Sequence, residues 1–310
     1  MDATALTLII FFPACLFTSW FFWRTSAAKP LKLLSVLVHE LGHVLTVWAC
    51  CGRVVDMDIN HREGGEVTWQ ARSRLHMFCA SHIVLPAGYW ATGACGNALI
   101  LSVTNIVSVT VGASLLICLF ALTLLLTFDE KGFKQPLQVI FWMLFVAVCL
   151  VVAWTFDTYV LLAHVLFNVG VFMVVYSVYD VFDDSIRRNI AGTDAAALAA
   201  MYPRFLTSTR VGVIWILQLL AMSAATVYGL LLLMRASNNN SDFNMHVKYS
   251  SLDSIDVHYF VPFLAVVLFH AFISVPVMNI NLRQLNASFL VEFSEQTSQA
   301  KRNDSGSGPA

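Results

Sequence analysis

The chain has 310 residues, of which 58% are hydrophobic and 12% are charged. A soluble domain of this length could not enclose so much apolar surface in one core, so we expect a lipid bilayer to surround much of the chain. The formal net charge of -1 gives no basic surplus for nucleic acid and no acidic excess typical of a disordered protein. Composition therefore favours an integral membrane protein without a nucleic-acid partner.

Apolar segments long enough to cross a bilayer recur along the chain. A helix needs roughly 20 apolar residues to span the hydrocarbon. About eight segments qualify, at residues 6–22, 31–50, 77–96, 106–128, 137–154, 159–179, 211–234 and 259–280. The predicted fold class is thus an all-α polytopic membrane protein of about eight transmembrane helices with one small β-hairpin.

The apolar segments divide the chain into four expected regions. Residues 1–30 form an N-terminal membrane anchor, 31–204 a membrane core, 205–282 two further transmembrane helices, and 283–310 a cytoplasmic, largely disordered tail. A signal peptide is the alternative for the first segment, since Ser26 and Ala28 are spaced like a cleavage site. The start MDATAL lacks the positive residues of a signal peptide, which favours a retained anchor.

Residues 52–70, with the sequence GRVVDMDINHREGGEVTWQ, interrupt the helical pattern. Apolar and β-branched residues lie on both sides of Gly64 and Gly65. Such a pattern is typical of a β-hairpin, and we expect its turn at the two glycines.

The segment LLSVLVHELGHVLTVW, residues 33–48, carries the strongest chemical signal. Four-residue spacing on a helix brings His39 and His43 to one face, at the separation that one metal ion needs, with Glu40 beside them. Two neutral imidazoles suit Zn²⁺, and Glu40 would accept a proton from water as a general base. Three ionisable residues so close together in a spanning helix are costly to insert, which favours function over structural hydrogen bonding.

A third metal ligand should come from another helix at the same depth. Asp180 lies about 10 Å along its helix before Arg187 and Arg188 mark the membrane interface, and His43 lies about 15 Å before Arg53. We therefore expect Asp180 as the ligand, with three rivals that are closer to the interface or in a loop, namely Asp183, Asp184 and Asp194. Pairing with the two arginines is the alternative reading of Asp183 and Asp184.

The segments from about residue 39 to residue 203 resemble the site-2 proteases, intramembrane zinc metallopeptidases, and especially their divergent site-2-protease-like branch. The resemblance rests on HELGH, on the hairpin after it, and on the small-residue segment PAGYWATGACGN at 86–97. In that family an Asp in an Asn…Leu-Asp-Gly motif supplies the third ligand. Its best counterpart is FNVGVFMVVYSVYD, with Asn168 preceding Asp180, although two aspartates replace the glycine. GTDAAALAAMYP, around Asp194, is similar to an SDA-containing segment of the divergent branch.

Lysine and arginine are unevenly distributed between the loops. Alternating the loops puts 13 of the 18 basic residues on the side that contains Arg53 and Arg187. The positive-inside rule makes that side cytoplasmic, so we expect a multi-pass protein of an endomembrane or the plasma membrane with its active site toward the cytoplasm.

These features predict a zinc metalloendopeptidase, with Zn²⁺ as its cofactor, acting on a transmembrane protein substrate in the lipid bilayer. Expected site residues are Glu40 as the catalytic base and His39, His43 and Asp180 as metal ligands. Two alternatives stay open: a catalytically silent membrane scaffold or chaperone of the same fold, and a transporter that uses the polar residues as an ion path. Substrate, membrane, oligomeric state and regulation are not encoded in a recognisable form.

Overall fold

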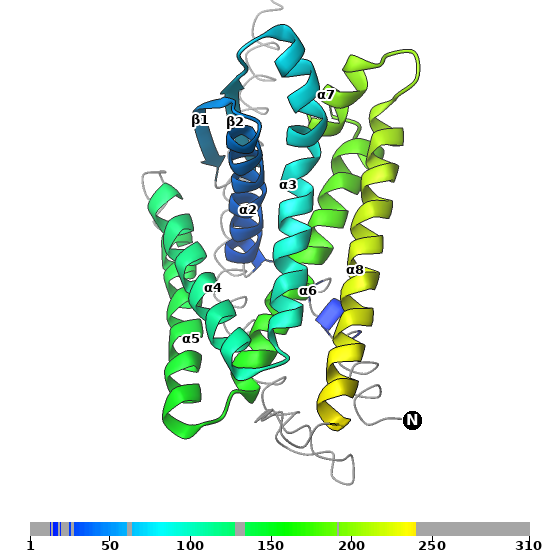
Figure 1. Cartoon of the computed structure of the whole chain (residues 1–310). Coiled ribbons are helices and arrows are strands. Elements are labelled where there is room, and N and C mark those ends of the chain that lie inside the picture. The colour runs from blue at the N-terminus through cyan, green and yellow to red at the C-terminus, as the bar shows by residue number, and fades with distance from the viewer. Residues whose placement is uncertain are drawn as a thin grey trace, which may run out of the picture.

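A computed structural model of the chain describes residues 13, 15–17, 19, 25, 28–60, 64–127, 134–190 and 192–239. The described part is mostly helical (Figure 1). In chain order the elements are α2 (Lys29–Ala49), β1 (Arg53–Asn60), β2 (Gly64–Gln70), α3 (Arg74–Ser102), α4 (Ile106–Thr127), α5 (Lys134–Phe156), α6 (Val160–Phe182), the π-helical turn η2 (Asp183–Arg187), α7 (Asp194–Met201) and α8 (Ser208–Asn239).

Five described helices are long and apolar enough to cross a membrane: Lys29–Ala49, Ile106–Thr127, Pro136–Phe156, Val160–Arg187 and Ser208–Leu233. They match five of the predicted segments. The predicted span at 77–96 lies inside α3, whose many small and polar residues leave it outside that set. The predicted span at 259–280, and most of the one at 6–22, fall outside the described residues, so the expected number of eight is not confirmed.

Helix α3 runs through the middle of the bundle and contacts α2, α6 and α8 (Figure 1). Small residues permit this close packing. A Cβ atom on Gly42 of α2 would lie 2.6 Å from the Ala87 carbonyl oxygen, and one on Gly96 of α3 would lie 2.7 Å from the Gly170 carbonyl oxygen of α6. Helix α3 therefore approaches both α2 and α6 almost backbone to backbone.

Strands β1 and β2 form an antiparallel hairpin beside α2, as the sequence predicts (Figure 1). The expected turn at Gly64 and Gly65 is wrong, because these glycines belong to β2 and pair with Asn60 and Ile59. The connection is made by residues 61–63, which lie outside the described part. Gly65 has a different role: the strand passes there directly over a side chain of α2.

Candidate metal centre and active site

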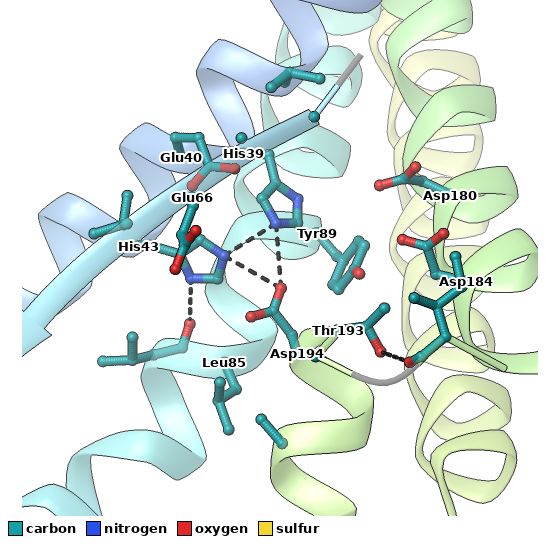
Figure 2. A pocket seen from close by; sticks show the side chains of 18 of the residues that line it. His39, Glu40, His43, Glu66, Leu85, Tyr89, Asp180, Asp184, Thr193 and Asp194 are labelled. Carbon is teal, nitrogen blue, oxygen red and sulfur yellow. Dashed lines mark hydrogen bonds and ion pairs between the residues drawn. The ribbon is translucent and has the colours of Figure 1, made fainter. Parts of the chain in front are cut away.

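His39 and His43 project from one face of α2, as their four-residue spacing predicts (Figure 2). Their Nε2 atoms lie 3.0 Å apart. Both side chains are largely enclosed, with 12% of His39 and 8% of His43 accessible. The two imidazoles thus present a pair of nitrogen atoms to a single point inside the protein.

Asp194, the first residue of α7, completes the group (Figure 2). Its Oδ2 atom lies 3.3 Å from the Nε2 atom of His39 and 3.3 Å from that of His43. Burial alone would raise the pKa of the Asp194 carboxyl, but its contacts with the two imidazoles outweigh burial and hold this pKa below its usual range. An ionised carboxylate is the form that could bind a metal.

The three donor atoms fit a zinc ion. Zinc in proteins has tetrahedral coordination with ligands at about 2.0–2.2 Å, which separates neighbouring donors by roughly 3.3–3.6 Å. The observed separations of 3.0, 3.3 and 3.3 Å approximate one face of such a tetrahedron. Two imidazoles and one carboxylate are also a donor set of catalytic zinc sites, in which the fourth position stays open.

A backbone carbonyl of α3 orients His43. The Nδ1 atom of His43 lies 2.8 Å from the Val84 carbonyl oxygen, which can only accept a hydrogen bond. Nδ1 therefore carries the proton and donates it. In a neutral ring the Nε2 lone pair is then available to a metal ion between the three donor atoms. Sequence reasoning missed this contact because a carbonyl group has no residue signature.

His39 is held against α3 by shape. Its ring packs edge-on against Tyr89, with ring centroids 4.5 Å apart. A Cβ atom on Gly88 would overlap the His39 ring. Gly88 therefore provides the space that the imidazole occupies, and this gives the small-residue segment at 86–97 a direct part in building the site.

Glu40 lies under the hairpin and is 3% exposed. A Cβ atom on Gly65 of β2 would overlap its carboxylate, so the strand crosses the glutamate in close contact. Figure 2 shows Glu40 of α2 beside the two histidines and near Glu66 of β2. Its position is that of a buried base next to the three-donor group.

Asp194 reaches the histidines because the chain reverses after α6. The π-helical turn η2 ends α6, Asn189 has a φ of 46° and Gly192 a φ of 94°, and these left-handed residues turn the chain back. The Thr193 side chain then accepts a hydrogen bond from the Ala196 backbone N–H and so starts α7. Gly-Thr-Asp is a helix-start pattern, and it is the signal that could have identified Asp194.

Asp180, the expected third ligand, does not lie with the two imidazoles, and the carboxylate beside them is that of Asp194. Within the described residues, the group of donors that could hold a metal ion is His39, His43 and Asp194. Asp180 instead lies across the cavity from that group (Figure 2). Distance along α6 alone favours Asp180, and from the sequence Asp194 is expected in a loop. The reversal of the chain after α6 instead brings Asp194 back toward the histidines.

The rival aspartates Asp183 and Asp184 pair with arginines, as their alternative reading predicts. Asp183 Oδ1 lies 3.0 Å from Arg187 Nε, and Asp183 Oδ2 lies 2.6 Å from Arg188 Nη2. Asp184 Oδ1 lies 2.8 Å from the same Arg188 atom. Asn168 is not among the residues that line the cavity around the histidines, and its amide donates to Cys15 Sγ at 3.5 Å.

A cavity of about 450 Å³ joins these features. The residues that line it come from α2, β2, α3, α6, η2, α7 and the segment leading into α7, and they include His39, Glu40, His43, Tyr89, Asp180, Asp184 and Asp194. The space is large enough for a short stretch of extended peptide with its side chains.

The fold and the site together define a helical membrane protein with a largely enclosed three-donor group that could hold a metal ion and with an adjacent glutamate. The chain belongs to the Peptidase M50B-like family, whose model matches residues 12–229. This match confirms the resemblance to the site-2 protease family. Comparison with curated proteins and with solved structures gave no significant match.

Proposed function

We propose that the protein is an intramembrane zinc metalloprotease that hydrolyses peptide bonds of membrane-spanning substrates. The observation that carries this proposal is the convergence of His39, His43 and Asp194, with donor atoms 3.0 to 3.3 Å apart, beside a buried Glu40. Membership of a peptidase family supports the same conclusion. The metal ligands would be His39 Nε2, His43 Nε2 and a carboxylate oxygen of Asp194.

Zn²⁺ at this position would act as a Lewis acid that makes a water molecule acidic enough to lose its proton near neutral pH. Glu40 is placed to receive that proton on its carboxylate and to deliver it to the nitrogen of the departing amine. Enclosure by α2, α3 and β2 limits the access of bulk water, which strengthens electrostatic interactions inside the site.

The hairpin supports an extended substrate next to Glu40. Among the described residues β2 pairs with β1 alone, and Gly64 to Val67 line the cavity. A substrate segment that has left its helical conformation can add to such a strand through backbone hydrogen bonds. This arrangement would place a peptide bond between β2 and the metal ligands.

Zinc content and proteolysis test the proposal together. Glu40→Gln in the purified full-length protein should reduce cleavage of synthetic single-span peptides by at least about 10³-fold, because glutamine keeps the volume but cannot accept the proton. Zinc measured by mass spectrometry of the metal should remain. His39→Ala should lose both zinc and cleavage.

Other outcomes identify the alternatives. Cleavage at the wild-type rate in Glu40→Gln would contradict the mechanism. Zinc without any Glu40-dependent cleavage would favour the silent scaffold, and ion flux through reconstituted protein that depends on Glu40 would favour the transporter.

The proposed orientation, with the site toward the cytoplasm, has its own test. The distribution of basic residues puts Asn239 on the lumenal or outer side, and it puts the sequons at Asn286 and Asn303 in the cytoplasm. Expression in a glycosylating cell should therefore give a glycan at Asn239 alone, mapped by glycopeptide mass spectrometry. A glycan at Asn286 would invert the topology.

A further inference from the structure

The cavity wall opposite His39, His43 and Asp194 carries two aspartates that are not among the proposed zinc ligands. Asp180 near the end of α6 and Asp184 in η2 are four residues apart, and both line the cavity. Figure 2 shows their carboxylates on the opposite side from His39 and His43, with the Tyr89 ring between the two groups. The site thus has a second polar wall.

The cavity as a whole has a surplus of negative charge. Five carboxylates line the cavity, those of Glu40, Glu66, Asp180, Asp184 and Asp194, and its described lining contains no lysine or arginine. Arg187 and Arg188, which do not line the cavity, balance the charges of Asp183 and Asp184. A zinc ion with its two positive charges would balance Glu40 and Asp194. Asp180 and Glu66 remain without a matching positive charge among these groups.

Two polar groups of the wall lack partners. The carboxylate of Asp180 makes no hydrogen bond or ion pair with any residue that the structure describes. Tyr89 is only 3% exposed, yet its hydroxyl group makes no hydrogen bond within the described ranges, and it lies in the field of Asp194, Asp180 and Asp184. Buried polar groups are nearly always hydrogen-bonded in native proteins, so the Tyr89 hydroxyl indicates a ligand. The partly buried Asp180 lines the same cavity.

We propose that Asp180, Asp184 and the Tyr89 hydroxyl form a subsite that accepts a lysine or arginine side chain of the substrate, next to the bond that is cleaved. An ammonium or guanidinium group donates several hydrogen bonds, and carboxylate and phenol oxygens accept them. The inference rests on the proposed protease function and names the substrate class for that site. Membrane-spanning segments offer such residues at their cytoplasmic ends, where lysine and arginine are concentrated.

A pair of peptides tests this subsite. The zinc-loaded full-length protein in micelles is given a synthetic single-span peptide with lysine at one position near the cleaved bond, or the same peptide with glutamine. The lysine position is moved one residue at a time along both sides of that bond. At its best position the wild-type protein should show kcat/KM at least about tenfold higher for lysine than for glutamine, since a close charge pair in a dry site contributes that much or more.

Variants of the subsite residues test which side chains cause the preference for lysine. Asp180→Asn should bring the lysine-to-glutamine ratio close to one, and Tyr89→Phe should lower it severalfold. Asp157→Asn is the matched control, because Asp157 is exposed in the turn between α5 and α6, and it should keep the wild-type ratio. A wild-type ratio near one at every position would overturn the proposal, as would an unchanged ratio in Asp180→Asn or in Tyr89→Phe.

Two further measurements separate this inference from the proposed function. Dissociation constants of both peptides for Glu40→Gln report the preference without cleavage, and equal values would overturn the subsite. Absence of Glu40-dependent cleavage would refute the proposed protease function. The dissociation constants would still decide whether the subsite prefers lysine. A second equivalent of zinc that is lost in Asp180→Asn would assign the wall to a metal ion and overturn the proposal.

Discussion

Helices α2 and α6 differ from α4, α5 and α8 in how much of their surface the protein covers. In the most apolar 18-residue stretch of each helix, the share of residues buried inside the protein is 72% in α2 and 78% in α6. It is 33% in α4, 28% in α5 and 17% in α8. The outer helices expose large apolar side chains such as Leu125, Val151 and Leu217, which suit contact with lipid. In Figure 1, α4 and α5 lie on one flank of the bundle and α8 on the other.

The inner helices carry the polar chemistry and the closely packed glycines. His39, Glu40 and His43 are on α2, Asp180 is on α6, and α3 supplies the Val84 carbonyl and the space at Gly88. Ionisable groups are costly in contact with lipid, so a site at membrane depth requires helices that are enclosed by other helices. Helices α4, α5 and α8 therefore belong to the outer part of the bundle, and no described residue of theirs is among those that line the cavity.

Removal of a metal ligand should give the largest effect. Asp194→Ala would leave two of the three proposed zinc ligands, and we expect the affinity for Zn²⁺ to fall by at least about 100-fold, more than a change next to a ligand would cause. Competition with a zinc-binding dye in the purified protein measures this affinity.

Asp180→Ala is the matched control for Asp194→Ala. It removes an aspartate from the same cavity and should leave zinc affinity within about threefold of wild type, because Asp180 lies outside the donor group. A greater loss of zinc in Asp180→Ala than in Asp194→Ala would restore the original assignment.

This pair of aspartates also marks how far the sequence alone leads. Four-residue spacing on one helix is a local property, so His39, Glu40 and His43 were found from the sequence, and so was the hairpin. The position of Asp194 depends on a π-helical turn and on left-handed Asn189 and Gly192, which redirect the chain by an amount that no periodicity encodes. The contacts of Val84, Gly88 and Gly65 depend on packing between elements and could not be predicted.

A methyl group added to an inner glycine should destabilise the protein more than one added to an outer glycine. In Gly96→Ala the new Cβ would lie 2.7 Å from the Gly170 carbonyl oxygen, so α3 and α6 must separate, at an expected cost of about 1–3 kcal/mol in the free energy of unfolding. Gly229→Ala in α8 is the control, since its Cβ would meet no atom within 4 Å and alanine favours a helix by about 1 kcal/mol. Unfolding by a denaturing detergent in mixed micelles compares them, and equal stabilities would contradict the close approach of α3 and α6.

The smallest of these effects concerns the contact between the hairpin and the inner helices. Neither Gly64 nor Gly65 has a positive φ, so alanine fits the backbone at both positions. A Cβ on Gly65 overlaps the Glu40 carboxylate, whereas a Cβ on Gly64 meets nothing within 4 Å. The flexible glutamate can move aside, so Gly65→Ala should keep its fold and its zinc.

Displacement of the Glu40 carboxylate should nonetheless slow cleavage, because a shift of about 1 Å in a catalytic group can cost up to roughly 100-fold in rate. Since the strand can also yield, we expect kcat for a single-span peptide to fall about tenfold in Gly65→Ala and to stay near wild type in Gly64→Ala. Equal rates in the two variants, with zinc content unchanged, would show that β2 does not position the base. A tenfold loss in Gly65→Ala alone would instead extend the functional unit from the inner helices to one strand of the hairpin, through a contact that only a residue without a side chain permits.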